Sequence, residues 1–311
     1  MVSVIIVDYK TIEKTCDYIE HLADNVEYKE LYHYIIIDND VHSSALEYLK
    51  SRYGSCYRVE TLENREIMVF NTQVGEVSYC VYGENAGFAK GNNLGVSTSS
   101  YLYHDEYYII SNNDLRLKKK LNIYKIINVF KSDNCISVIG PRIEGVDSKL
   151  QSPYKKATPF YLLIVYQWSR FWPFYSKGDL IEMNHSGYCY RIMGCFMIIK
   201  AEPFKEIGGF DEETFMYCEE MILSERMKSK GYKCYYYNDY TVVHEHGSTV
   251  KQYVNNTKND RWTYSSLLYY CKEYRNAGSV LLFFATLSRA LNVRVMYLKE
   301  GVKKYLRKKK G

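Results

Sequence analysis

Short apolar runs that alternate with helical periods mark the first 140 residues of the chain. The runs are rich in β-branched and aromatic residues, which is typical of buried strands. They cover residues 2–7, 34–37, 77–82, 107–110 and 136–139. Between them, the spacing of apolar residues predicts helices over about residues 11–24 and 43–52, and the glycine-rich residues 83–95 open another. This alternation indicates an α/β fold with an open, mostly parallel sheet flanked by helices.

Acidic side chains follow several of these predicted strands at the point where each strand ends. Asp8, Asp38, Asp40 and Asp114 occupy such places. In open α/β sheets the ligand binds at the carboxyl ends of the strands. We therefore expect the functional site at this edge of the sheet.

The second half of the chain has a less regular pattern. Residues 145–185 hold three of the five prolines and two of the three tryptophans, and they predict a long, partly helical excursion over the sheet. Strand character returns over residues 190–200, and a helix is predicted from about Glu219 to its closing Gly231. One or two strands follow within residues 232–243. Residues 258–306 read as helical without a clear hydrophobic break.

Composition places the chain among ordinary globular proteins, with 47% hydrophobic and 25% charged residues. None of the nine cysteines is spaced as Cys-x-x-Cys, so we expect neither a zinc site nor a disulfide framework, and a reducing cytosol is the simpler location. The first residues lack a basic segment, so we expect no signal peptide. No run reaches the roughly 18 consecutive apolar residues of a membrane span.

The basic excess of the chain is confined to its C-terminus. Six Lys and Arg residues fall within residues 303–311, and removing six positive charges from the net +5 leaves −1 on residues 1–302. Such a tail can contact anionic lipid or nucleic acid, or it can be a solvated terminus. The preceding apolar stretch is interrupted by Arg289 and Arg294, which argues against a span. It favours a helix at a membrane surface, or one packed on the preceding domain or on a second subunit.

The stretch GENAGFAKGNNLG (residues 83–95) has four glycines but matches neither a dinucleotide-binding fingerprint nor a P-loop. Glycines permit close approach of a ligand, and the amides of Asn85, Asn92 and Asn93 offer donors and acceptors. A tight turn from strand to helix explains the same pattern.

The stretch SNND, from Ser111 to Asp114, ends a predicted strand with one carboxylate and two amides. Divalent Mg or Mn prefers oxygen ligands and commonly takes several of them from phosphate and water. Asp114 can therefore suffice as a protein carboxylate, with Asn112 adding a neutral oxygen. The alternative is an Asx turn that ends the strand.

Two further clusters carry groups suited to chemistry. Asp211, Glu219 and Glu220 belong to an acidic segment at a predicted helix start, where a carboxylate either complements the helix dipole or acts as a general base. His244 and His246 lie two residues apart after an apolar run, so on a strand they share a face, where one can bind metal or phosphate.

Taken in order, these segments make the chain resemble a family-2 glycosyltransferase with the GT-A fold, most closely the rhamnosyltransferase-like branch of bacterial surface-polysaccharide synthesis. The matching stretches are VSVIIVDYKT, IIIDND, NAGFAKGNNLG, IISNNDLRL, MGCFMIIK, GGFDEETFMYCEEMILSERMKSKGY and VVHEHGST, spread over about residues 2–250.

The resemblance implies a role for each matched residue. Glu220 takes the place of the catalytic base, with Glu219 and Asp211 as second candidates. Asp114 matches the final, metal-binding Asp of the Asp-x-Asp motif, Asn112 replaces its first Asp, and His244 lies near metal or diphosphate. The nucleotide-sugar would be bound by Val7, Asp8, Tyr9, Asp38, Asn85, Gly87, Gly91, Asn92, Asn113, Gly209 and Phe210.

The chain departs from the family pattern at four of these places. Asn112 is neutral, Glu220 is one methylene longer than the usual Asp, Ile222 replaces an acidic residue, and Asp8 stands where Asn is usual. Glu220 keeps the carboxylate group of the base, but its longer side chain changes where that group can lie.

The resemblance implies glycosyl transfer by single displacement with inversion, assisted by Mg or Mn. The donor would be dTDP-rhamnose or a UDP-hexose, and the acceptor a saccharide, free or lipid-linked, in capsule, O-antigen or cell-wall synthesis. We expect a cytoplasmic protein, at the inner face of the membrane if its C-terminus contacts lipid, and we leave a homodimer open.

We expect a catalytic domain over residues 1–250, divided into a nucleotide-binding part (1–140) and an acceptor-binding part (141–250). Residues 251–311 would form a helical extension with a basic tail. Two alternatives remain: a glycosyltransferase-like protein that binds nucleotide-sugar without turnover, and a nucleic-acid-binding protein that uses the tail. The net charge of −1 on the rest of the chain argues against the second alternative.

Overall fold

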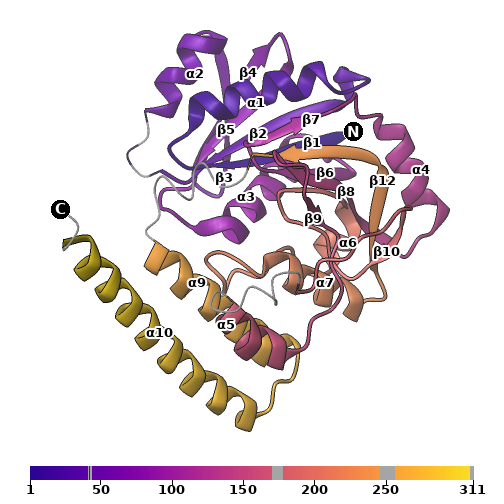
Figure 1. Ribbon diagram of the computed structural model, residues 1–311. Coiled ribbons are helices and arrows are strands. Elements are labelled where there is room, and N and C mark those ends of the chain that lie inside the picture. The colour runs from indigo at the N-terminus through magenta and orange to yellow at the C-terminus, as the bar shows by residue number, and fades with distance from the viewer. Residues whose placement is uncertain (41, 43, 170–177, 246–255, 309–311) are drawn as a thin grey trace.

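The computed structural model describes residues 1–40, 42, 44–169, 178–245 and 256–308, and within them a twisted sheet with helices on both faces (Figure 1). The strands are β1 (Val2–Asp8), β2 (Tyr32–Asp38), β3 (Tyr57–Leu62), β4 (Arg65–Thr72), β5 (Gly75–Val81), β6 (Tyr107–Ser111), β7 (Leu115–Leu117), β8 (Ile136–Gly145), β9 (Leu150–Ser152), β10 (Gly187–Cys189), β11 (Phe196–Lys200) and β12 (Lys233–His244). The α-helices are α1 (Ile12–Asp24), α2 (Ala45–Tyr53), α3 (Gly87–Leu102), α4 (Ile123–Ser132), α5 (Tyr166–Trp168), α6 (Ala201–Glu206), α7 (Glu219–Ser229), α9 (Asn256–Tyr269) and α10 (Ser279–Lys308). A 3₁₀ turn spans Lys29–Leu31, and π-helical turns span Tyr161–Val165 and Tyr270–Tyr274.

The main path of the sheet runs β10-β12-β8-β11-β6-β1-β2-β5-β4-β3, with β7 paired to β12 and β9 paired to β8. The central strands β6, β1, β2 and β5 are parallel. Outside them, β11 runs antiparallel to β6 and β8, and the β3–β4–β5 meander is antiparallel. The α/β prediction is confirmed, but the sheet is mixed rather than mostly parallel, because hairpins extend the parallel centre.

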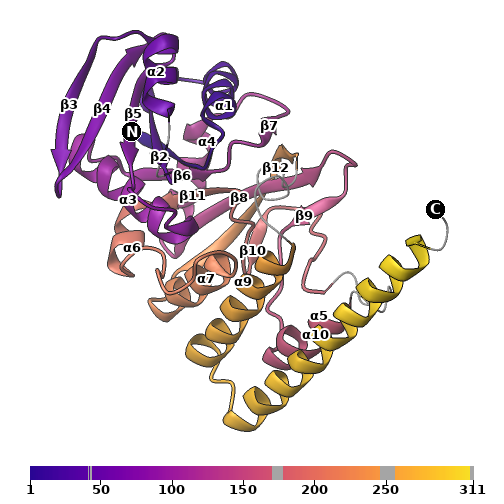
Figure 2. The ribbon, with the colours of Figure 1, turned by 90° about the vertical axis from the view of Figure 1, so that its left-hand side faces the viewer.

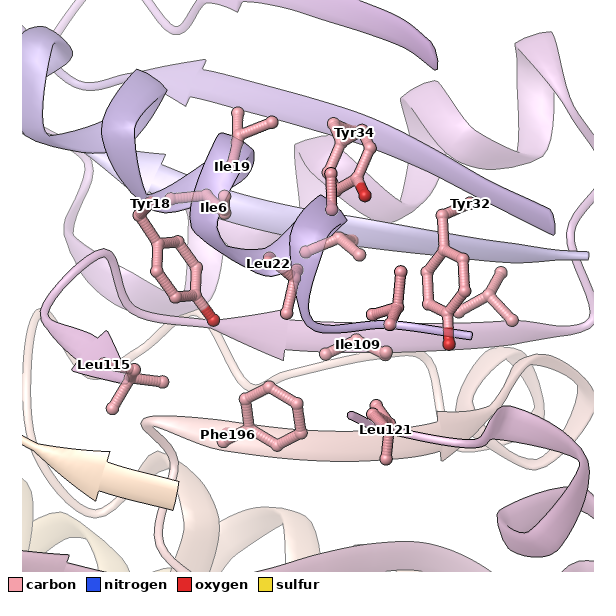
Figure 3. Close-up of a cluster of buried hydrophobic side chains, with 14 of the residues drawn as sticks. Ile6, Tyr18, Ile19, Leu22, Tyr32, Tyr34, Ile109, Leu115, Leu121 and Phe196 are labelled. Carbon is pink, nitrogen blue, oxygen red and sulfur yellow. The ribbon is translucent and has the colours of Figure 1, made fainter. Parts of the chain in front are cut away.

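Apolar side chains on both faces of the sheet are covered by helices, which is why its central strands read as continuous apolar runs. On one face, α1, α2 and α4 cover residues such as Ile6 and Ile109, as seen for α1 in Figure 3. On the other face, α3, α6 and α7 cover residues such as Ile5 and Ile110. The sheet thus forms the middle of three layers and fixes the positions of its strand ends.

A third apolar cluster joins the C-terminal helices to α7. Leu163 of the excursion, Ile222 of α7 and Tyr270 after α9 are all buried in it. In Figure 2, α9 and α10 lie beside α7 and α5, away from the strands β3 and β4. The β8, β11 and β12 strands of the second half belong to the same sheet as β1, so the predicted division at residue 140 does not divide the sheet.

The structure corrects several predicted elements. No strand was predicted for β3 and β4, and within residues 190–200 only Phe196–Lys200 is a strand. The helical pattern of residues 258–306 breaks between Tyr274 and Ser279, where Asn276 has a positive φ of 50°. By length and average composition, Ser279–Lys299 could cross a membrane despite its arginines, and it is the one such helix in the described part of the chain.

Candidate active site

The parallel pairing of β1, β2 and β6 brings the predicted strand-end residues to one edge of the sheet. Asp8 lies in register with Asp38, and Ile5 of β1 with Ile110 of β6, so Asp114 follows on the same side. Asp8, Asp38 and Asp114 are all buried. The placement predicted from the apolar runs therefore holds, but the three carboxylates have different surroundings.

The Asp8 carboxylate holds the first turn of α1. It accepts hydrogen bonds from the Thr11 backbone N–H at 3.1 Å, the Thr11 hydroxyl at 2.8 Å and the Thr15 hydroxyl at 2.5 Å. The Asn113 amide donates to the same two hydroxyls at 2.9 and 2.7 Å. Burial raises the pKa of Asp8, while these hydrogen bonds lower it. Asp8 and Asn113, both predicted to bind the nucleotide-sugar, thus lie in a network that joins β1, α1 and the SNND loop.

The Asp38 carboxylate is likewise held from within the protein. One oxygen accepts the Asp40 backbone N–H at 2.8 Å and the other accepts the Tyr79 hydroxyl at 2.7 Å. The next side chain, Asn39, donates to the Gly87 carbonyl at 3.0 Å and so ties the end of β2 to the start of α3. Binding of the nucleotide by Asp38 stays a prediction. It would require the carboxylate oxygens of Asp38 to accept a further hydrogen bond from the ligand.

The glycines at the start of α3 are required by protein packing. A Cβ on Gly87, whose φ is +79°, would overlap the Phe215 carbonyl, and one on Gly91 would lie 2.9 Å from the Val7 side chain. Asn85 accepts the Gly87 N–H at 3.4 Å, and Asn92 donates back to the Phe88 carbonyl at 2.9 Å. A tight turn from strand to helix therefore explains the glycines, and the nucleotide-sugar-binding roles of Asn85, Gly87, Gly91 and Asn92 stay predictions.

Tyr9 follows β1 at the same edge and is half-buried, with the Lys10 ammonium 5.3 Å from its ring centre. Its position fits a wall beside a flat ligand. The binding role of Tyr9 stays a prediction.

Asp114 and His244 come together because β7 pairs with β12. His244 lies opposite Leu115 in the antiparallel register, and the Glu245 N–H donates to the Asp114 carbonyl at 2.9 Å. As a result, His244 Nε2 lies 3.3 Å from Asp114 Oδ1, with both side chains nearly buried. Two residues that are 130 positions apart and predicted as metal ligands thus face each other.

Gln151 of β9 fixes the orientation of the His244 ring. Its Oε1 lies 3.0 Å from His244 Nδ1, so Nδ1–H donates to the amide oxygen. Nε2 then faces Asp114 with either a lone pair or, in the imidazolium, a proton. Metal-binding histidines usually have this arrangement, in which the second ring nitrogen is held by an oxygen acceptor.

These side chains fit a divalent cation when further oxygen ligands come from a substrate. Within the described residues, no group of three or more His, Cys, Asp and Glu side chains could hold a metal. Asp114 and His244 supply one carboxylate and one imidazole, donors that Mn and Mg sites accept alongside phosphate oxygens. His246 lies outside the described residues.

The backbone of Asn112 joins the loop to a neighbouring segment, because its N–H donates to the Cys195 carbonyl at 2.9 Å. Burial raises the pKa of the Cys195 thiol, and the charges of Asp114 and Glu220 act in the same direction. Glu220 bonds the N–H of Gly194, the residue before Cys195, so the predicted base and the SNND loop contact adjacent residues although Asp114 and Glu220 are 106 positions apart in the chain. That the predicted metal ligand and the predicted base act in one site stays a prediction.

Glu219 and Glu220 begin α7 after two residues in the left-handed region, Tyr217 and Cys218, with φ of 74° and 71°. Glu220 is half-buried, and its Oε1 accepts the Gly194 N–H at 3.3 Å. Glu219 is buried, and burial together with the neighbouring Glu220 raises its pKa to about 8. The raised pKa favours the protonated form of Glu219, which makes Glu220 the stronger candidate for the base.

Arg191 balances the negative charge beside Glu220. It is buried, stacks on the Tyr154 ring at 3.6 Å and pairs with Asp179 at 2.7 Å. The charge of Glu220 is one of the interactions that favour its ionised form. The charge of the predicted base thus acts on a buried guanidinium that already has Asp179 as its carboxylate partner.

Asp211 faces the C-terminal helices. Its carboxylate accepts the hydroxyls of Tyr269, at 2.9 Å, and Tyr274, and hydrogen bonds of this kind lower its pKa despite burial. The preceding Gly209 and Phe210 pack on α3, where the Phe210 N–H donates to Asn93 at 2.9 Å. These contacts give Gly209, Phe210 and Asp211 structural roles. Their functional roles stay predictions.

The sequence analysis missed Gln151, Arg191 and Cys195. Gln151 lies in the irregular excursion, where no period signals its face. Arg191 and Cys195 fall within a stretch predicted as one strand, and a lone charge next to an apolar run was the available signal for Arg191. Their contacts depend on how distant strands pair, which spacing along the chain does not reveal.

Comparisons with known proteins agree with this architecture. No protein-family model matches the chain. It is 25% identical over 228 residues to the low-salt glycan biosynthesis hexosyltransferase Agl10 of Haloferax volcanii, covering 71% of this chain and 67% of the relative. The crystal structure of GalNAc-T7 with UDP, GalNAc and Mn²⁺ superposes with a TM-score of 0.54 and 14% identity, covering 78% of this chain but only 43% of that one.

The structure of Staphylococcus aureus TarS 1–349 with UDP has a TM-score of 0.47 and 14% identity, over 89% of this chain and 73% of that one. The GalNAc-T7 match supports the fold. By its GT-A fold and by its sequence similarity to a hexosyltransferase, the chain is confirmed as glycosyltransferase-like, while the rhamnosyltransferase-like branch stays a prediction.

Proposed function

We propose that the protein is an inverting glycosyltransferase that moves a sugar from dTDP-rhamnose or a UDP-hexose to a saccharide acceptor, lipid-linked in surface-polysaccharide synthesis. The observation that carries this proposal is that Asp114 faces His244, while Glu220 and the loop that ends in Asp114 contact the adjacent residues Gly194 and Cys195. It would combine a cation-binding pair and a carboxylate base in one place. The similarity to a hexosyltransferase supports the same class of reaction.

Asp114 and His244 would hold Mg or Mn, with Gln151 orienting the imidazole. When bound, the cation would offset the negative charge that grows on the leaving nucleoside diphosphate. The Mn²⁺ and UDP in the GalNAc-T7 crystal are consistent with this use of the fold. Asn112 begins the same loop and would add a neutral oxygen.

Glu220 would accept the proton of the acceptor hydroxyl as that oxygen attacks the anomeric carbon. Its carboxylate is held by the Gly194 N–H, while the buried Arg191 offsets its charge. Burial and the charge of Glu220 raise the pKa of Glu219, which favours its protonated form and would leave Glu220 as the base. A single displacement needs only one such base. The other buried carboxylates would then have structural roles.

The first experiment is a panel of nucleotide-sugars with Mn²⁺, in which donor hydrolysis and thermal shift are measured for the wild type and for Asp114→Ala. We expect one donor to be hydrolysed slowly and to raise the melting temperature most, and Asp114→Ala to abolish both effects. Asp239→Ala, an exposed strand carboxylate, is the matched control and should behave as wild type. Tight nucleotide binding without any turnover would instead favour a non-catalytic binding protein.

A further inference from the structure

Helix α10 directs its polar side chains toward the protein. Asn292 is buried and donates to the Gln167 carbonyl at 2.7 Å, and Ser288 accepts the Trp168 indole N–H at 2.8 Å. Arg289 donates to the Gln167 side chain at 3.1 Å and forms an ion pair with Asp260. The face that packs on α5 and α9 is therefore fixed by polar contacts.

The opposite face of α10 is exposed and mainly apolar, with the exposed Arg294 as a charged residue between Leu291 and Leu298. Its residues recur at helical spacing and form one stripe, here called the outer stripe: Val280, Phe283, Phe284, Leu287, Leu291 and Leu298, with exposed fractions between 47% and 69%. In Figures 1 and 2, α10 lies at the periphery of the molecule, and no described element covers its outer side. This is the reverse of α1, whose Tyr18, Ile19 and Leu22 are buried.

An apolar stripe of this size in water marks a binding surface. The stripe and residues 303–308 of the basic tail share one helix, because α10 has 30 residues and ends at Lys308. Six Lys and Arg residues lie within residues 303–311, whereas the rest of the chain has a net charge of −1. An apolar face followed by a cationic end is the composition of helices that bind anionic lipid.

We propose that α10 lies flat on an anionic membrane, with the outer stripe buried at the headgroup boundary and the basic end among the headgroups. The helix is about 45 Å long, so it would hold one side of the molecule against the surface. This proposal rests on the helix alone and does not require glycosyl transfer.

The polar contacts of α10 favour lying on the membrane over spanning it. Only 11% of the apolar window in Ser279–Lys299 is buried, so it is not a core helix. A span, however, would have to break the Arg289–Asp260 ion pair and carry Arg289 and Arg294 into hydrocarbon. A second copy packed in parallel on the outer stripe would bring two strongly basic ends together, which like-charge repulsion disfavours.

The test is flotation of the full chain with vesicles of phosphatidylcholine alone or mixed with phosphatidylglycerol. We expect binding only to the anionic vesicles, weakened by salt. The variant Phe283→Ser/Phe284→Ser/Leu287→Ser should bind at least tenfold more weakly. Val59→Ser/Tyr124→Ser/Val146→Ser removes equally exposed apolar residues elsewhere and should bind as wild type.

The charge arm uses Lys303→Gln/Lys304→Gln/Arg307→Gln, for which we expect about a hundredfold weaker binding to anionic vesicles. Lys119→Gln/Lys120→Gln/Lys131→Gln removes three exposed charges elsewhere and is its control. Circular dichroism checks that each variant is folded. The proposal is overturned if wild type ignores anionic vesicles, if both α10 variants bind normally, if bound protein resists high-salt and alkaline extraction as a span would, or if the outer-stripe variant only abolishes a dimer.

Discussion

Asp8 and Asp114 both follow buried strands of the parallel centre of the sheet, and both are buried, yet their surroundings differ in kind. Asp8 is surrounded by donors: a backbone N–H and two hydroxyls from α1. Asp114 faces an imidazole nitrogen whose ring is oriented by Gln151. A carboxylate that accepts several fixed donors stabilises the fold, whereas one that faces a second metal-type ligand is arranged for a cation. Position at a strand end therefore does not assign a role; the neighbouring groups do.

The largest effect should come from the carboxylate predicted to share the site of Asp114. Glu220→Gln keeps the hydrogen bond from Gly194 but cannot accept a proton, so we expect kcat to fall by roughly 10²- to 10⁴-fold. Donor binding, measured by calorimetry with the nucleotide-sugar, should be unchanged. Glu219→Gln is the neighbouring control and should stay active at neutral pH. Normal transfer by Glu220→Gln would move the base to Glu219 or Asp211.

The comparison of Asp8 with Asp114 predicts opposite outcomes for one substitution. Asp8→Ala leaves the donors of Thr11 and Thr15 without their acceptor, so we expect the free energy of unfolding to fall by about 3 kcal/mol in urea titrations. Asp114→Ala should lower the free energy of unfolding by less than Asp8→Ala does, because it keeps the hydrogen bond from the Glu245 N–H to the backbone carbonyl of residue 114. If Asp114→Ala proves the more destabilising, the contrast between the two carboxylates fails.

The fold was predictable where one local signal sufficed. Buried parallel strands such as β1, β2 and β6 are continuous apolar runs, and α1 follows the helical period. The edge strand β3 was missed because its side chains are largely solvated, so Arg58 and Glu60 interrupt any apolar run. The turn to β4 uses positive φ at Glu63 and Asn64, a conformation that Glu rarely signals.

Individual residues of the candidate site could be predicted from the sequence, but the contacts between them could not. Asp114 and His244 were named from the groups at two strand ends, and pairing of β7 with β12 then brought them together. Gln151 reaches His244 only because β9 pairs with β8 and β8 pairs with β12. Such contacts depend on register between strands about 90 residues apart, and the hydrophobic pattern of one strand does not specify its neighbour.

Gln151 provides a test of intermediate size on the Asp114 side of the comparison. Gln151→Ala removes the acceptor that holds His244 Nδ1–H, so we expect Mn²⁺ affinity, measured by electron paramagnetic resonance with nucleoside diphosphate present, to fall by about 10- to 100-fold. Gln151→Glu keeps an oxygen acceptor and should restore most of it. Equal Mn²⁺ binding by wild type and Gln151→Ala would mean that His244 is not a ligand, and Asp114 would then differ less from Asp8 than we infer.

The smallest effect concerns Glu219, a buried carboxyl that has neither the donors of Asp8 nor the partner of Asp114. Its pKa of about 8 in the folded protein lies above the ordinary Glu value. At pH values between these two pKa values, the folded state therefore holds a proton that the unfolded state has lost. The stability from this group is fully present below the ordinary Glu pKa and is lost as the pH rises through about 8. We expect the melting temperature of the wild type to fall by a few degrees relative to Glu219→Gln as the pH rises from 5 to 8. Glu66→Gln, at an exposed position on β4, should follow the wild type. A parallel pH profile for Glu219→Gln and wild type would mean that Glu219 is ionised in the folded protein, and it would then have to be reconsidered beside Glu220 as the base.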